Sequence, residues 1–102
     1  QPRDSSSASI AACGLLEMAK YAGPEKGALC RSLAARFMKS LTEKYAVKDF
    51  DRSNGLVLHS TYSNHSPYNT CNHYGVDECN LWGDYFYMEA LTRMYKDWNV
   101  YW

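Results

Sequence analysis

Two helix-length stretches that are apolar on almost every side limit what this chain can fold into. They run from about residue 8 to residue 22 and from about residue 81 to residue 98. In the first, the polar side chains form one narrow stripe of Ser9, Glu17 and Lys20, and the second carries six aromatic rings. A helix that is apolar all round is normally enclosed by neighbours. We therefore expect both helices to be buried on most sides.

A third predicted helix, from residue 24 to about residue 46, has a different pattern. Pro24 suits its first turn, and its charged residues lie mostly away from one apolar stripe. That stripe has strict four-residue spacing and consists of Leu29, Leu33, Phe37, Leu41 and Tyr45. Only Gly23 and Pro24 separate this helix from the first one, so we expect the two to form an antiparallel hairpin.

The flanks of these helices carry further signals. The first helix is preceded by Asp4 and the serines at 5–7, whose oxygens are good acceptors for the N–H groups of a helix start. After the hairpin comes a long irregular passage, 47–80, in which only GLVLHSTY after Gly55 predicts a short strand. Irregular passages of this length are uncommon in a small domain unless they are functional. We therefore expect the loop to contribute to a binding site.

Composition excludes some classes of partner. Eleven basic residues balance eleven acidic ones in a chain of 102 residues, which is the size of one domain. No net charge attracts nucleic acid or an anionic membrane, and no apolar run approaches the roughly 20 residues of a membrane span. Three helices of which two are apolar all round leave surface uncovered in an isolated bundle. Because the chain also begins without methionine, we expect it to be part of something larger and to pack against helical neighbours.

Three segments resemble one enzyme family. They read RDSSSASIAACGLLEMAKY, NGLVLHSTYS and GVDECNLWGDYFYMEALTRMYKDWNVYW. Together they are similar to the C-terminal part of the unsaturated glucuronyl hydrolases, which are glycoside hydrolases with an (α/α)6 barrel. The resemblance covers nearly the whole chain and is weakest between residues 24 and 52. It implies an all-α fold in which 1–102 is a single segment, the C-terminal part of the barrel, with a long loop on the substrate side.

The implied barrel assigns a place to each segment. Residues 8–22 and 81–98 become inner helices, 24–46 an outer helix, and 47–80 the loop that leads to the start of the last helix. The starts of both inner helices then face one mouth. Because helix N-termini favour anions, we expect this end, with Arg3, to bind the carboxylate of a uronate, with simple helix capping as the alternative explanation.

The resemblance also implies an activity. The family acts on oligosaccharides that polysaccharide lyases produce, which carry a 4,5-unsaturated uronic acid at the non-reducing end. An aspartate protonates the vinyl ether, water adds to the neighbouring carbon, and the terminal sugar is released. That aspartate and its partner carboxylate are expected upstream of Gln1, so no catalytic residue is assigned in this chain and no cofactor is expected. We interpret Asp77, Glu78 and Asp84 as helix-capping acids.

The loop contains candidate substrate-binding residues. Relatives that prefer sulfated fragments carry Ser-x-x-Ser-x-Lys in this region, and this chain matches with Ser60 and Ser63 but has His65 in place of lysine. An imidazole with a pKa of about 6.5 is charged only in acid, so a preference for sulfate is not implied. Tyr62 and Trp82 are candidates for contact with a sugar, with loop anchoring and core packing as the respective alternatives.

The cysteines allow two further interpretations. The two that lie in predicted helices are typical of small buried apolar residues. In the loop, a disulfide between Cys71 and Cys79 is left open, and zinc binding would need these two together with His65 and His73. Their spacings lack the tight cysteine pair of structural zinc sites, so no metal site is predicted.

Two other functions stay open at this point. One is the related unsaturated rhamnogalacturonyl hydrolase activity, and the other is a non-catalytic helical module that binds a partner through its apolar faces. For the enzyme, the expected partners are an unsaturated oligosaccharide and the remainder of the barrel, with no nucleic acid and no membrane. Bacterial cytoplasm and periplasm are both compatible with the sequence.

Overall fold

The computed structural model describes residues 3–51, 53–63, 67 and 75–99. These residues form three helices, α1 (Ser5–Met18), α2 (Pro24–Lys44) and α3 (Leu81–Tyr95). No strand occurs in this part of the chain, which confirms the all-α prediction; the segment after Gly55 forms only two isolated bridges, Ala46 with Val57 and Ser60 with Glu78. None of the described helices is long and apolar enough to span a membrane.

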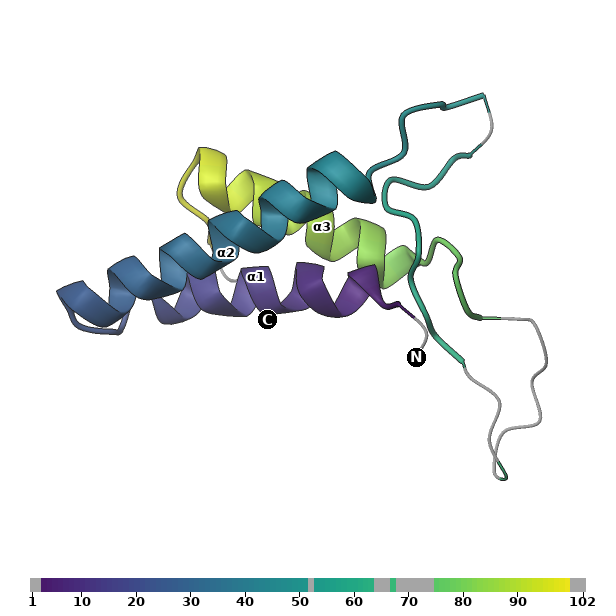
Figure 1. Ribbon diagram of the computed structural model, residues 1–102. Helices are drawn as coiled ribbons and strands as arrows, with labels where there is room; N and C mark the ends of the chain where they lie inside the picture. Colours follow the sequence, from purple (N-terminus) through teal and green to yellow (C-terminus); the bar gives the residue numbers. More distant parts are fainter. Residues whose placement is uncertain (1–2, 52, 64–66, 68–74, 100–102) are drawn as a thin grey trace.

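The three helices pack around α1. This helix contacts both α2 and α3, whereas α2 and α3 meet at only a few points. Figure 1 shows that α1 and α3 start at the same end of the molecule and that α2 runs in the opposite direction. The hairpin predicted from the turn at Gly23 and Pro24 is therefore confirmed.

The helix boundaries differ from the predicted ones for local reasons. α1 begins at Ser5 rather than near residue 8, because Asp4 Oδ1 accepts the backbone N–H of Ser6 at 3.1 Å and caps the helix. It ends at Met18 rather than near residue 22, and the chain then tightens into a turn. α3 ends at Tyr95 because the next residue is extended, with φ −152° and ψ 169°.

The core lies where the three helices and the loop meet. Small side chains let the helices approach closely, and the buried apolar residues are Ala12, Cys13, Ala34, Met38, Leu41, Val57, Tyr87 and Ala90. The hydroxyls of Tyr87 and Thr42 lie 2.9 Å apart and join α3 to α2. The core therefore depends on alanines as well as on the large apolar side chains.

Two predicted faces are wrong. On α2, Leu29 and Phe37 are 59% and 38% exposed, although both belong to the predicted apolar stripe. Each four-residue step turns a helix by about 40° too far, so a long row of such steps winds away from the core. The buried row instead combines three- and four-residue steps through 30, 34, 38 and 41. On α1, the predicted polar stripe includes Ser9, which is fully buried and donates to the carbonyl of Ser5 at 3.1 Å.

Much apolar surface on α3 is uncovered in the described part of the chain. The large exposed side chains, here called the open face of α3, are Leu81, Trp82, Tyr85, Met88, Leu91, Met94 and Tyr95. The expectation that apolar surface is left without a cover is confirmed for the described residues. Large exposed apolar patches normally mark a contact surface.

Candidate functional site

The starts of α1 and α3 meet the loop at one end of the molecule (Figure 1). Ser5 Oγ lies 2.9 Å from Ser60 Oγ and donates to the carbonyl of Leu58 at 2.7 Å. Gly83, in the first turn of α3, completes this junction, because a Cβ there would lie 2.9 Å from Ser60 Oγ and 3.2 Å from the Cβ of Ser6. The junction is therefore close-packed and holds two helix starts and the loop together.

Residues 56–61 of the loop, here called the anchored segment, are tied to both helices by aspartates. Asp84 Oδ1, in α3, accepts the backbone N–H groups of the first two residues of the segment at 3.1 and 3.0 Å. Asp4 Oδ1, before α1, accepts the backbone N–H of its last residue at 3.2 Å. Hydrogen bonds to carboxylates are stronger than those between neutral groups. The segment is thus held at both ends.

Asp4 also organises the start of α1. Its carboxylate accepts the hydroxyls of Ser6 and Ser7, each at 2.5 Å. Burial alone would raise the pKa of Asp4, but hydrogen bonds from Ser6, Ser7 and Thr61 together outweigh it and hold the pKa below its ordinary value of 3.8. Asp4 is therefore a charged cap at neutral pH.

Tyr62 comes directly after the anchored segment and forms an edge-to-face aromatic pair with Trp82 of α3. Their ring centroids are 6.0 Å apart and their planes meet at 85°. Gly75 supports the pair: it accepts the backbone N–H of Tyr62 at 2.7 Å, and its φ of +83° favours glycine. Tyr62 is 50% exposed and Trp82 43% exposed. The pair therefore offers an apolar ring surface to solvent on which a sugar ring can stack.

The other predicted substrate-binding residues have varied surroundings. Ser60 is fully buried and its hydroxyl is bonded within the junction, so this geometry gives it a supporting role and not the predicted contact with substrate. Ser63 is half-buried and donates its N–H to the carbonyl of Gly75 at 3.1 Å. Arg3 is exposed and lines a pocket of about 280 Å³ between α1 and α2. His65 lies outside the described residues.

Two of the acids before α3 belong to the loop and not to the cap of the helix. Asp77 pairs with Nδ1 of His59, and these two residues have positive φ angles of 62° and 64°. Glu78 and Ser60 exchange backbone hydrogen bonds of 3.0 and 2.7 Å. The capping role predicted for Asp77 and Glu78 is therefore wrong, because Asp77 contacts the side chain of His59 and Glu78 binds the backbone of Ser60.

The cap of α3 is Asn80, which the sequence interpretation missed. Its side-chain oxygen accepts the backbone N–H of Gly83 at 2.7 Å. An asparagine directly before an apolar helix is a known start signal, so it was available in the sequence. The role of Asp84 was not, because its carboxylate binds backbone 27 and 28 residues away.

No metal site is found in the part of the chain that the structure describes, where no three His, Cys, Asp or Glu side chains are grouped to hold an ion. Cys79 Sγ lies 3.8 Å from the hydroxyl of Ser53. Its predicted disulfide partner, Cys71, lies outside the described residues, as do His65 and His73. The disulfide therefore stays a prediction.

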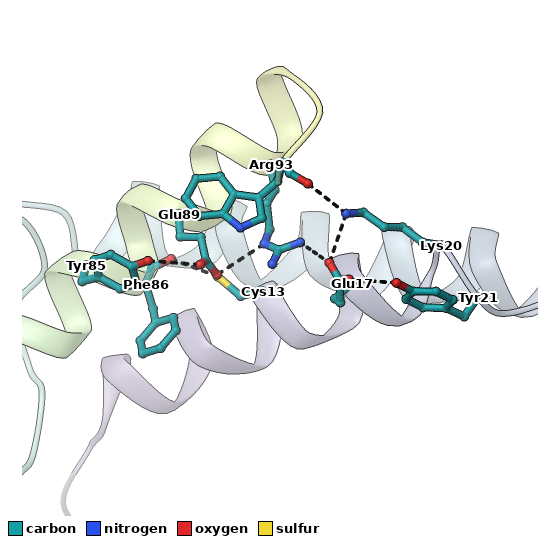
Figure 2. A network of polar contacts seen from close by, with 9 residues as sticks. Cys13, Glu17, Lys20, Tyr21, Tyr85, Phe86, Glu89 and Arg93 are labelled. Atoms are coloured by element: carbon teal, nitrogen blue, oxygen red, sulfur yellow. Dashed lines mark hydrogen bonds and ion pairs between the residues drawn. The ribbon is translucent and has the colours of Figure 1, made fainter. Parts of the chain in front are cut away.

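A second polar cluster lies at the opposite end of α1 and α3 (Figure 2). Arg93 donates to Glu17 at 2.5 Å and to Glu89 at 3.3 Å, and its guanidinium lies 5.4 Å from the centre of the Trp98 ring. Lys20 binds Glu17 at 3.1 Å and the carbonyl of Trp98 at 3.2 Å. These two cations are already paired with acids of the chain. We therefore interpret the cluster as a clasp between the helices.

The known proteins that are similar to this chain include unsaturated chondroitin disaccharide hydrolases and an unsaturated glucuronyl hydrolase. No family model matches it. The unsaturated chondroitin disaccharide hydrolase of Streptococcus pneumoniae is 46% identical over 105 residues, which cover 100% of this chain and 25% of that protein. The unsaturated glucuronyl hydrolase of Bacillus sp. strain GL1 is 32% identical over 103 residues, which cover 98% of this chain and 26% of that protein.

The solved structures that are similar to this chain include unsaturated glucuronyl hydrolases as well. The unsaturated glucuronyl hydrolase of Streptococcus agalactiae matches with a TM-score of 0.82 at 43% identity, over 100% of this chain and 26% of that one. The enzyme of Bacillus sp. GL1 matches with a TM-score of 0.77 at 32% identity, over 92% of this chain and 24% of that one.

The fold is therefore that of a segment of an α/α-barrel hydrolase, as predicted. More closely, the chain belongs to the unsaturated glucuronyl hydrolase family, and it spans about a quarter of the length of the relatives that it matches. The family predicted from the three sequence segments is confirmed.

Proposed function

We propose that this chain is one part of an enzyme that hydrates the 4,5 double bond of an unsaturated uronic acid at the non-reducing end of lyase-generated oligosaccharides and releases that sugar. The relatives support this, because they are named as hydrolases of unsaturated chondroitin disaccharide or of unsaturated glucuronyl groups. A further solved structure similar to this chain is an aspartate-to-asparagine variant with dGlcA-Glc-Rha-Glc. The observation that carries the proposal is the exposed pair of Tyr62 and Trp82 at the joint start of two helices.

In this proposal the pair forms one wall of the substrate mouth. A sugar ring stacks on Trp82, and the phenol of Tyr62 supplies a polar edge beside it. The starts of α1 and α3 carry partial positive charge, which favours the uronate carboxylate. Arg3 is exposed near the start of α1 and adds a permanent positive charge to this end.

The loop beyond the pair would contact substituents of the neighbouring sugar. We assign that contact to Ser63 and His65, while Ser60 supports the loop from inside the junction. An uncharged imidazole binds a sulfate group less strongly than an ammonium group does. The proposed enzyme therefore does not depend on sulfate at this position.

The remainder of the barrel would supply what this segment lacks. We place α1 and α3 in the inner ring, because each is apolar on most sides, and the amphipathic α2 in the outer ring. Apart from Trp82, the open face of α3, on which Leu81 is 83% and Tyr95 89% exposed, would then pack against further helices. The acid and base aspartates are proposed to come from those helices, and no catalytic residue is assigned among residues 1–102.

The proposal is tested by the reaction itself. The whole enzyme is mixed with an unsaturated chondroitin disaccharide or with an unsaturated rhamnogalacturonan disaccharide, and the ultraviolet absorbance of the conjugated double bond is followed. We expect the absorbance to fall and the terminal sugar to be released, faster with the glucuronyl substrate. Faster turnover of the rhamnogalacturonan substrate would favour the related activity, and no turnover of either would favour a non-catalytic module.

A further inference from the structure

Asp84 has an unusual task for an acid in the first turn of a helix. Such acids commonly interact with the N–H groups of their own helix. Here the cap is Asn80, and one oxygen of Asp84 accepts two N–H groups of the loop, from Leu56 at 3.1 Å and from Val57 at 3.0 Å. Because Val57 is fully buried, its N–H would lose its partner without this carboxylate. Asp84 therefore fixes the first residues of the anchored segment.

The far end of the anchored segment determines where Tyr62 lies. Thr61 donates its N–H to Asp4 at 3.2 Å and its hydroxyl to the carbonyl of Arg3 at 2.7 Å. Tyr62 follows at once and forms the edge-to-face contact with Trp82. The tyrosine is thus carried by a short stretch of backbone that is fixed at both ends.

Asp84 stands in the same helical turn as Trp82, the other member of the aromatic pair. The helix therefore fixes Trp82 relative to Asp84, and the hydrogen bonds of Asp84 fix the segment that carries Tyr62. We infer that Asp84 is a positioning residue that holds Tyr62 against Trp82 and so preforms the aromatic wall for a sugar ring. The effect on sugar binding rests on the proposed function, whereas the positioning of Tyr62 by Asp84 does not.

Steady-state kinetics of the whole enzyme test the consequence. Asp84→Asn keeps an oxygen that accepts both N–H groups, and Asp84→Ala removes it. Asp51→Ala is the control, since Asp51 is an exposed aspartate near the start of the loop. We expect Asp84→Ala to raise KM for the unsaturated disaccharide about tenfold with a smaller change in kcat, and Asp84→Asn and Asp51→Ala to stay close to wild type. Equal KM values in Asp84→Ala and wild type, or an equal rise in both Asp84 variants, would overturn the assignment.

A double-mutant cycle separates positioning from general stability. If Asp84 acts through Tyr62, then Asp84→Ala should add little to the KM change of Tyr62→Ala. Fully additive changes would contradict the inference, because they would mean that Asp84 acts elsewhere.

Hydrogen exchange tests the structural part without any substrate. In Asp84→Ala, the backbone N–H groups of 56–63 should exchange about tenfold faster than in wild type, and in Asp84→Asn and Asp51→Ala at about the wild-type rate. Unchanged exchange in Asp84→Ala, or fast exchange in a folded Asp84→Asn, would overturn the inference. An enzyme that is inactive on both disaccharides but shows the expected exchange pattern would overturn the proposed function alone.

Discussion

Replacing Gly83 with alanine tests whether the junction of the two helix starts is as close-packed as the structure indicates. The added Cβ would lie 2.7 Å from Asn80 Oδ1, 2.9 Å from Ser60 Oγ and 3.2 Å from the Cβ of Ser6. The first two distances are shorter than carbon and oxygen normally approach in folded proteins. The three neighbours come from α1, the loop and the cap before α3, so no single flexible side chain can relieve the contact.

The size of the effect follows from opposing contributions. Overpacking a well-packed site costs roughly 1–3 kcal/mol, and disturbing an asparagine cap costs roughly 0.5–2 kcal/mol. Alanine favours the helix over glycine by about 1 kcal/mol. We therefore expect Gly83→Ala to lower the free energy of unfolding by about 0.5–4 kcal/mol, the net of these contributions.

Urea unfolding of the whole enzyme measures this change, with Gly14→Ala as the matched control. Gly14 lies within α1, and a Cβ there would have no atom of the described residues within 4 Å. Gly14→Ala should therefore raise the free energy of unfolding by about 0.5–1 kcal/mol. A Gly83→Ala variant that is as stable as wild type would mean that the junction is not close-packed.

Three further predictions concern single side chains. Asp4→Ala should destabilise the protein by about 0.5–2 kcal/mol at neutral pH. Because the pKa of Asp4 is lowered in the folded state, its contribution is present above the ordinary value of 3.8 and is lost as the pH falls through the folded value; a difference in unfolding free energy that stays constant well below pH 3.8 would contradict this. Burial and the neighbouring Glu89 raise the pKa of the Cys13 thiol, so iodoacetamide should leave Cys13 unlabelled in the folded protein near neutral pH and label it in urea; labelling of the native protein at Cys13 would count against the buried site. His65→Lys should improve kcat/KM for a sulfated disaccharide over its unsulfated counterpart by about tenfold at neutral pH, and an unchanged ratio would mean that the loop does not read sulfate.

The sequence predicted the three helices because their signals are local. Pro24 after a glycine, the acid and serines before α1, and the apolar run from Leu81 each depend on neighbouring residues. The buried face of α2 was predicted wrongly, because large apolar residues such as Leu29 were taken to face the core. Which face is buried depends on the helix that packs there, and α1 meets α2 through small side chains.

The candidate site was predictable only in part. Tyr62 and Trp82 were each selected from the sequence, but their contact joins residues that are twenty positions apart through a loop. Ser60 was selected for its hydroxyl, and only the fold reveals that this hydroxyl is enclosed by Ser5. Asp84 was interpreted as a helix-capping acid, and its contact with the loop gave no signal, because the groups that it binds are backbone atoms, which every residue has.

In the proposed function, the pair of Tyr62 and Trp82 faces the substrate. The most direct test is kcat/KM of the whole enzyme for an unsaturated chondroitin disaccharide in Trp82→Ala, with Tyr21→Ala as the control. Tyr21 is 82% exposed and lies in the turn after α1, far along the chain from the pair. We expect about a tenfold loss of kcat/KM for Trp82→Ala, the size of one aromatic contact, and no loss for Tyr21→Ala. Equal kcat/KM in Trp82→Ala and wild type would contradict it.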